Sequence, residues 1–222
     1  APSHKCKEIK QSFLQVSLYT TGHMLGAACT YLEIKENGKI TRIAYTGDIG
    51  RQHSYLLPTP ENFPQCDYLI TESTYGSRIH EPEEDAQNLL LQTVYNTCVE
   101  KRGKLIIPSF AVGRCQEILY VLNQLYNEHK LPSIKVFVDS PLAINATGVF
   151  LAHTEYLNDN VRRTMLYDDD PFSFNNVTYI RDVEKSKALN KYRKPCIIIS
   201  ASGMLEAGRV KHHVANNIMK PQ

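Results

Sequence analysis

The pattern of apolar residues changes near residue 75, and this change limits the folds that the chain can adopt. Before it, apolar and polar residues alternate in three segments, 13–20, 28–36 and 39–46. Alternation with a period of two is typical of half-buried strands. Asn37-Gly38 separates the second segment from the third and predicts a tight hairpin turn, because both residues tolerate positive φ. A short apolar strand is expected at 67–71, so the first third should form a sheet of antiparallel or mixed strands.

After this point, short apolar segments alternate with segments of helical periodicity. The expected strands are 104–107, 134–138, 177–180 and 196–200. The expected helices are one with Pro82 in its first turn that ends at Gly103, one with Ile118, Val121, Leu122 and Leu125 on one face, one that begins at Ser140-Pro141 and continues to about Leu157, one at 183–192, and one with Val210, Val214 and Ile218. Continuously apolar strands that alternate with helices predict a parallel sheet covered on both faces, which is an α/β fold.

Charge and cysteine usage narrow the classes of protein. Lysine plus arginine number 25 against 23 for aspartate plus glutamate, a formal net charge of +2, so a nucleic-acid binder of this kind must use a local site. The longest apolar run is too short for a membrane span. Six scattered cysteines without a C-x-x-C pair predict reduced thiols, and hence a cytoplasmic protein, or a nuclear one if the organism is eukaryotic.

Three segments of the first third each place one ionisable residue after an apolar strand and beside glycines. They are T-T-G-H-M-L-G-A (20–27), Y-T-G-D-I-G-R (45–51) and T-E-S-T-Y-G (71–76). His23 is a candidate imidazole ligand and Asp48 a candidate carboxylate ligand of a metal ion. Glu72 is a candidate acid, base or ligand-orienting group. Each segment taken alone also fits an ordinary turn or cap.

A second group of candidates would bind phosphate. Ser109 and Arg114 lie between an expected strand and the start of a helix, and Ser202 and Arg209 lie at a similar turn. Helix starts attract anions through free backbone N–H groups, and an arginine can bind a phosphate with two hydrogen bonds. A plain capping role is the competing interpretation for the two serines.

In this order the three glycine-rich segments resemble the metallo-β-lactamase superfamily and, more narrowly, its β-CASP nucleases, which process RNA. The resemblance continues through I-P-S-F-A-V-G-R-C-Q-E-I-L (107–119), D-S-P-L-A (139–143) and S-A-S-G-M-L-E-A-G-R (200–209). It covers nearly the whole chain from about residue 13. It implies part of an αββα metallo-β-lactamase domain at 1–75 and a β-CASP α/β domain at 76–222.

The resemblance also implies roles for the candidate residues. His23 would bind one zinc ion, Asp48 would bridge two, and Glu72 would support a metal-bound histidine. Two neighbouring zinc ions can activate a water molecule and hold a phosphodiester for attack. The residues that would grip the phosphates of single-stranded RNA are Ser109, Arg114, Ser202 and Arg209. The implied function is zinc-dependent hydrolysis of RNA, as an exonuclease or an endonuclease.

The sequence departs from the family pattern in its histidines. The zinc signature H-x-H-x-D-H and the later histidine motifs are absent, and adjacent residues such as His212 and His213 point apart on a helix. His23 and Asp48 alone give neither zinc enough ligands. We therefore expect a fragment of a ribonuclease that is inactive by itself and binds zinc weakly. Unpaired strand edges in the first third predict self-association, for example as a homodimer.

Two alternatives stay open at this point. The first is a non-catalytic β-CASP subunit that binds RNA or a protein partner. The second is a metallo-hydrolase of small esters, against which the segments 107–119 and 200–209 argue. DNA is an alternative to RNA as the nucleic acid.

Overall fold

The computed structural model describes residues 9–11, 13–78 and 85–219 of the 222-residue chain. It divides into two compact units. The first consists of Ala1–Glu81 with Tyr156–Asn158, and the second of Pro82–Glu155 with Asp159–Gln222. The change of sequence pattern placed the division between residues 75 and 76. Each unit is described by itself.

The first unit contains a five-stranded sheet in the order β1-β2-β3-β4-β5. Its strands are β1 (Ile9–Gln11), β2 (Leu14–Thr20), β3 (Ala28–Glu36), β4 (Lys39–Tyr45) and β5 (Tyr68–Ile70). The first four are antiparallel neighbours, and β5 runs parallel to β4. Asn37 and Gly38 have φ values of 49° and 80°, which confirms the predicted hairpin turn. The short strand β1 was not expected from the sequence.

The side chains of the first sheet meet in a small core. Cys29, Tyr31 and Ala44 are buried there, and Tyr19 contacts Tyr31 edge to face with 6.1 Å between ring centroids. At the edge of the sheet, all three residues of β5 are exposed. An unpaired apolar edge is what the sequence predicted. The self-association expected from this edge stays a prediction.

The second unit is built on a four-stranded sheet in the order β6-β9-β7-β8. The strands are β6 (Lys104–Pro108), β7 (Lys135–Asp139), β8 (Val177–Tyr179) and β9 (Cys196–Ser200). Every neighbouring pair is parallel, and all five residues of β9 are buried. The predicted parallel sheet is therefore confirmed, and its carboxyl ends share one edge.

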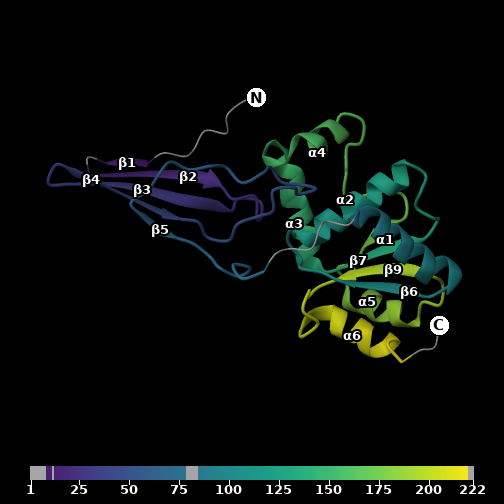
Figure 1. Ribbon diagram of the computed structural model, residues 1–222. Coiled ribbons are helices and arrows are strands. Elements are labelled where there is room, and N and C mark those ends of the chain that lie inside the picture. The colour runs from purple at the N-terminus through teal and green to yellow at the C-terminus, as the bar shows by residue number, and fades with distance from the viewer. Residues whose placement is uncertain (1–8, 12, 79–84, 220–222) are drawn as a thin grey trace. The chain divides into compact units, whose positions relative to one another are not determined.

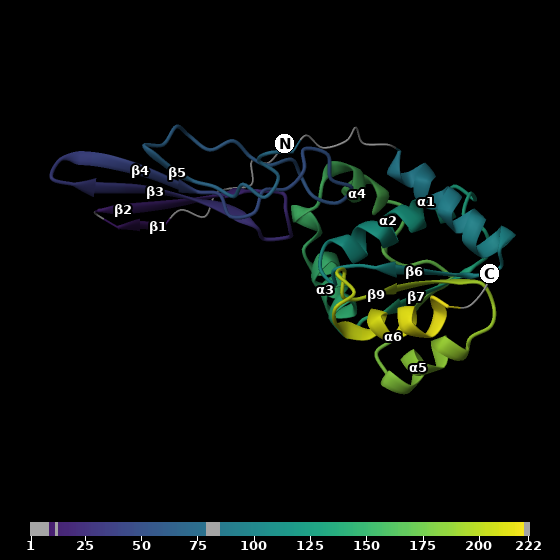
Figure 2. The same ribbon diagram turned by 60° about the horizontal axis from the view of Figure 1, so that its bottom comes forward.

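Helices cover both faces of this sheet (Figures 1 and 2). They are α1 (Ala86–Val94), continued by a π-helix (Tyr95–Glu100), α2 (Arg114–Asn127), α3 (Pro141–Ala152), a 3-10 turn (Thr154–Tyr156), α4 (Asp159–Thr164), α5 (Val183–Lys191) and α6 (Gly208–Asn217). The helices α1 and α2 lie on one face, and α5 and α6 lie on the other. None of the helices in the described ranges is long and apolar enough to span a membrane.

The structure describes the residues of three of the four expectations about these helices. Ser140 caps α3 as predicted, since its hydroxyl accepts a hydrogen bond from the Ala143 N–H (3.2 Å). The expected extension of this helix to about Leu157 is wrong, because α3 ends at Ala152 and a 3-10 turn follows. Ile218 is exposed rather than buried. Pro82 lies outside the described residues.

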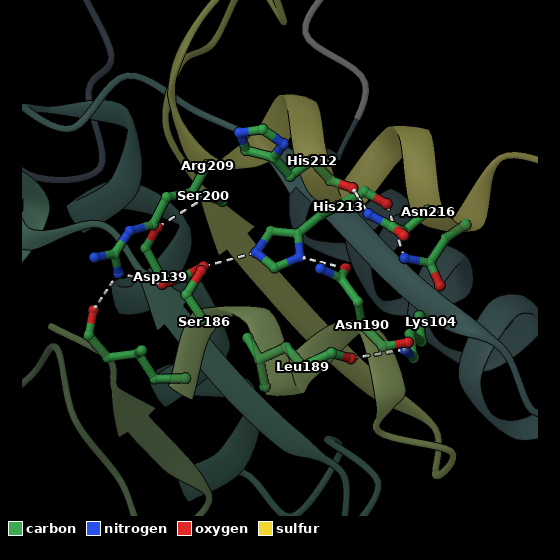
Figure 3. Close-up of polar contacts among 12 residues, drawn as sticks. Lys104, Asp139, Ser186, Leu189, Asn190, Ser200, Arg209, His212, His213 and Asn216 are labelled. Atoms are coloured by element: carbon green, nitrogen blue, oxygen red, sulfur yellow. Dashed lines mark hydrogen bonds and ion pairs between the residues drawn. The ribbon is translucent and has the colours of Figure 1, made fainter. Parts of the chain in front are cut away.

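The carboxyl end of β7 carries a buried charge, Asp139, which has no exposed surface (Figure 3). Its carboxylate accepts hydrogen bonds from His213 Nε2 at 2.6 Å, Ser186 Oγ at 2.5 Å and Arg209 Nη1 at 2.7 Å. Its backbone carbonyl accepts a fourth from Ser200 Oγ at 2.9 Å. One aspartate thus joins the last residue of β9 to α5 and α6.

Two of these partners extend the network. Arg209 also donates to the carbonyl oxygens of Ile180 (3.2 Å) and Arg181 (2.7 Å), which follow β8. The other ring nitrogen of His213, Nδ1, lies 3.0 Å from Asn190 Oδ1. Hydrogen bonds therefore join the carboxyl ends of β7, β8 and β9 to one another and to the helices α5 and α6.

The partners of Asp139 decide its ionisation. Burial alone would raise the pKa of a carboxyl group, because it disfavours the charged form. The hydrogen bonds from His213, Ser186 and Arg209 outweigh this effect and hold the pKa of Asp139 below its usual range. The ionised form is thus the one that the fold requires.

We predict that Asp139→Asn destabilises the second unit by about 3–5 kcal/mol near neutral pH, because Arg209 loses its buried counter-charge. Since the pKa of Asp139 is lower in the folded than in the unfolded chain, the carboxylate stabilises the fold above about pH 4. This contribution is lost as the pH falls further, through the folded-state pKa. Urea unfolding at several pH values measures both effects.

Asp169→Asn, at an exposed position of the same unit, is the matched control and should leave the free energy of unfolding nearly unchanged. A similar free energy of unfolding for Asp139→Asn and Asp169→Asn would contradict the role assigned to Asp139.

Candidate functional site

His23, Asp48 and Glu72 lie in loops that follow β2, β4 and β5. These three strands run in the same direction, because β2 and β4 are both antiparallel to β3 and β5 is parallel to β4. Their carboxyl ends consequently share one edge of the sheet. His23 Nε2 lies 3.8 Å from Asp48 Oδ2, and Glu72 Oε1 accepts a hydrogen bond of 2.7 Å from the Ile49 N–H.

Two glycines allow the loops to approach closely. A Cβ atom at Gly50 would lie 2.2 Å from the carbonyl carbon and oxygen of Gly22, so a side chain there would collide with backbone. The Gly50 N–H donates to the Thr21 carbonyl (2.8 Å). These contacts join the loop of His23 directly to the loop of Asp48. The pairing of the two side chains is thus a result of the backbone arrangement.

Glu72 is held as an anion by this arrangement. The hydrogen bond from the Ile49 N–H, followed by one from Thr74, lowers the pKa of Glu72, and His23 contributes to the same effect. By binding Ile49, Glu72 positions the residue next to Asp48. The role implied for Glu72, support of a metal-bound histidine, stays a prediction.

The side chains of this edge fit part of a metal site. His23 and Asp48 are 40% and 68% exposed, and imidazole nitrogen and carboxylate oxygen are both zinc ligands. A tetrahedral site needs further donors. Within residues 9–11, 13–78 and 85–219, no group of three or more His, Cys, Asp or Glu is arranged to hold a metal ion. Of the described residues, His23 and Asp48 therefore fit two ligands of a metal site, and the incomplete zinc site expected from the missing motifs stays a prediction.

The second group of candidates lies at the carboxyl edge of the parallel sheet. The last residues of β6 and β9, Pro108 and Ser200, are register partners, so the loops that follow them are neighbours. The Ser109 N–H donates to the Ser200 carbonyl (3.1 Å), and its side chain is almost fully buried. Its hydroxyl is hydrogen-bonded to the Cys115 thiol, whose pKa burial raises to about 12. Ser202 Oγ accepts a hydrogen bond from the Met204 N–H (3.3 Å), as a turn-capping serine does.

The two candidate arginines differ in their surroundings. Arg114 begins α2 with a 47% exposed side chain, and its Nη1 lies 2.8 Å from Glu117 Oε2. Arg209 is 19% exposed and donates to Asp139 and to two backbone carbonyls (Figure 3). The Arg114 side chain is therefore about half exposed and paired with one carboxylate of its own helix, whereas Arg209 is largely buried and uses much of its hydrogen-bonding capacity within the fold. The phosphate-binding role stays a prediction for both.

The sequence analysis missed three residues that shape this edge. Gln116 is fully buried, and its Nε2 donates to the Ala111 carbonyl (3.2 Å) while its Oε1 accepts from the Gly113 N–H (2.8 Å). Asp139 and His213 are the other two. Each is a polar residue at a position where the periodicity predicts a buried apolar side chain. This mismatch was the signal in the sequence that could have identified them.

The expectation that His212 and His213 point apart is confirmed. His213 is 1% exposed and contacts Asp139, whereas His212 is exposed (Figure 3). His213 lies three residues after Val210 on α6, so its side chain occupies the buried stripe of the helix. The helical periodicity that placed Val210 and Val214 on one face of the helix places His213 on that face as well.

Comparison with known proteins gives a consistent result. Residues 115–222 match the Beta-Casp domain. The chain is 32% identical over 209 residues to Ribonuclease TTHA0252 of Thermus thermophilus, a match that covers 94% of the chain and 47% of that protein. It is 37% identical over 200 residues to the RNase J-like protein of Methanocaldococcus jannaschii, covering 89% of the chain and 44% of the relative.

A eukaryotic relative shows the same pattern. Cleavage and polyadenylation specificity factor subunit 3 of Dictyostelium discoideum is 33% identical over 205 residues, which cover 91% of the chain and 25% of that protein. The chain thus spans less than half the length of these curated relatives. Together with the parallel sheet, the family match confirms the resemblance drawn from the motifs. Residues 115–222 are therefore a β-CASP domain, the domain of the β-CASP family of the metallo-β-lactamase superfamily, whose members work with metal ions.

Proposed function

We propose that this chain is part of a zinc-dependent ribonuclease that hydrolyses phosphodiester bonds of single-stranded RNA. The observation that carries the proposal is the approach of His23 to Asp48, 3.8 Å between Nε2 and Oδ2, at an edge that also holds Glu72. The names of the relatives support it, since Ribonuclease TTHA0252 and the RNase J-like protein align with most of the chain.

In this proposal His23 and Asp48 are two of the zinc ligands, and further ligands complete the set. The metal ions, when bound, would supply an activated water molecule and a clamp for the phosphodiester. Glu72 acts as a positioning residue, because its hydrogen bond to the Ile49 N–H fixes the loop that presents Asp48. The glycine contact between the two loops keeps His23 beside Asp48.

The carboxyl edge of the parallel sheet would bind the RNA backbone. Arg114 supports this part of the proposal most directly, because its side chain is 47% exposed and a guanidinium has five N–H donors, so that a phosphate could bind it beside Glu117. Ser109 and Ser202 shape the two neighbouring turns, and Arg209, whose charge is paired with Asp139, would offer a phosphate its remaining N–H groups. The net charge of +2 requires such a local site.

We predict that Arg114→Ala weakens binding of a single-stranded RNA and makes the slope of log affinity against log salt shallower by about one, as expected for one lost phosphate contact. Filter binding with the chain over a range of salt concentrations measures both quantities. Arg193→Ala is the matched control, since Arg193 is exposed and precedes β9 at the opposite edge of the sheet. Equal losses in the two variants would show attraction by overall charge and contradict a site at Arg114.

We predict that the chain alone binds zinc weakly and does not cleave RNA, because His23 and Asp48 do not complete a zinc site. Calorimetric titration with zinc, followed by incubation with labelled RNA, tests both points. His23→Ala should remove most of the residual heat of binding, and His129→Ala, in the second unit, should leave it unchanged. Two tightly bound zinc ions per chain would contradict the prediction.

We predict that Glu72→Gln lowers RNA cleavage by a full-length form of the protein by about 10- to 100-fold, the range found when a group that orients a metal ligand is altered. Asp48→Ala should cause a larger loss, because it removes a ligand itself. Cleavage rates and zinc content are measured together, with Asp169→Asn as control. Unchanged cleavage in Asp48→Ala would exclude Asp48 as a ligand.

A further inference from the structure

Phe110 exposes an aromatic ring at the carboxyl edge of the parallel sheet. It follows Ser109 in the loop between β6 and α2, and 58% of its surface is accessible. The neighbouring Ala111 is buried, so the loop is anchored on one side and presents Phe110 on the other. A single exposed apolar residue is common in proteins. The surroundings of this one distinguish it from an ordinary exposed side chain.

The loop that carries the ring is held in place by internal hydrogen bonds. The carbonyl oxygen of Phe110 accepts from the Cys115 N–H (3.3 Å). The buried side chain of Gln116 binds the Ala111 carbonyl and the Gly113 N–H at 3.2 and 2.8 Å. Phe110 therefore extends from a fixed backbone, and little conformational entropy is lost when its ring binds a ligand.

The turn after β9 supports the ring from one side. A Cβ atom added at Gly203 would lie 3.1 Å from both Cδ2 and Cε2 of Phe110 and 3.2 Å from its backbone nitrogen. A side chain at this position would be in tight contact with the ring and would require Phe110 to shift slightly. Gly203 therefore lies against one part of the ring, and more than half of the surface of Phe110 remains accessible to solvent.

The chemistry around Phe110 matches a single-stranded nucleic acid. Arg114, four residues further on, has a side chain that is 47% exposed and paired with Glu117. Ser109 and Ser202 directly precede Phe110 and Gly203 in the two neighbouring loops. An aromatic ring beside a positive charge is the arrangement by which proteins bind single strands, with a base on the ring and a phosphate at the cation. An apolar surface for a protein partner would not need this charge.

We propose that Phe110 is a stacking platform for one base of the single-stranded RNA. The inference rests on the proposed function and deepens it, because it adds a contact to a base where the proposed function has only contacts to phosphates. Stacking uses the face of a base, so the contact accepts any of the four bases. It also selects single strands, since a base within a duplex is already stacked on its neighbours.

The test compares variants of Phe110 by their affinity for a single-stranded RNA of mixed sequence, using fluorescence anisotropy with the intact chain. Phe110→Ala and Phe110→Leu should each lower the affinity by about 5- to 100-fold, because both remove the aromatic face. Phe110→Trp should retain the affinity. The dependence of affinity on salt should be the same in all variants, because no phosphate contact is lost. Val112→Ala, at an exposed apolar residue of the same loop, is the control and should bind like the wild type.

A second ligand separates stacking from a change in loop shape. An oligonucleotide of the same length with abasic sites keeps the phosphates and lacks the bases. It should bind the wild type about as weakly as the full RNA binds Phe110→Leu, and the Phe110→Leu substitution should not weaken it further. If the substitution weakens both ligands equally, the ring shapes the loop and the stacking proposal is wrong.

The remaining outcomes distinguish this proposal from the proposed function. In one outcome, the wild type binds RNA with the expected salt dependence, and Phe110→Ala and Phe110→Leu bind it as tightly as the wild type does. That result excludes stacking and leaves the phosphate contacts in place. If the wild type binds no RNA, both proposals are excluded. Urea unfolding of each variant shows whether Phe110→Ala is folded, and Phe110→Leu and Phe110→Trp provide the comparison if it is not.

Discussion

The buried carboxylate of Asp139 is the interaction on which the second unit depends. A charge without solvent contact is tolerated only where hydrogen bonds and an opposite charge replace the lost water. Here His213, Ser186 and Arg209 do so, and each comes from a helix on the same face of the sheet. Because Arg209 also binds the segment after β8, satisfying one carboxylate fixes the edge at which the candidate phosphate site lies.

The two candidate sites follow the same structural rule. In both sheets, strands of the same direction end at one edge, and the loops that follow carry the polar residues. Glycine allows close contact between neighbouring loops in each case. Gly50 lets the loop of Asp48 touch the backbone of Gly22, and Gly203 lets the turn after β9 touch the ring of Phe110. The backbone thus places the functional side chains, and side-chain hydrogen bonds then hold the loops.

Much of the fold could be predicted from local pattern. The hairpin at Asn37-Gly38 and the strand at Cys196–Ser200 were predicted with correct or nearly correct bounds, because turn chemistry and periodicity act over a few residues. The end of α3 at Ala152 was not, since no glycine or proline follows it before Leu157 and a 3-10 turn continues the coiled backbone. Ile218 was expected to be buried because it continues the spacing of Val210 and Val214, although it follows the last residue of α6 and is exposed.

The sequence by itself determined the fold class, the motifs and the chemical type of each candidate residue, because these depend on residue identity and on short spacings. The tertiary structure alone decided which of those residues have partners. It directed the guanidinium of Arg209 to the distant Asp139, whereas that of Arg114 pairs with Glu117 on its own helix and its side chain stays about half exposed, although both follow similar strand-to-helix turns. It also placed His213 against the carboxylate of Asp139, 74 residues earlier in the chain. Hydrogen bonds between distant segments depend on the packing of whole elements, and no local pattern specifies them.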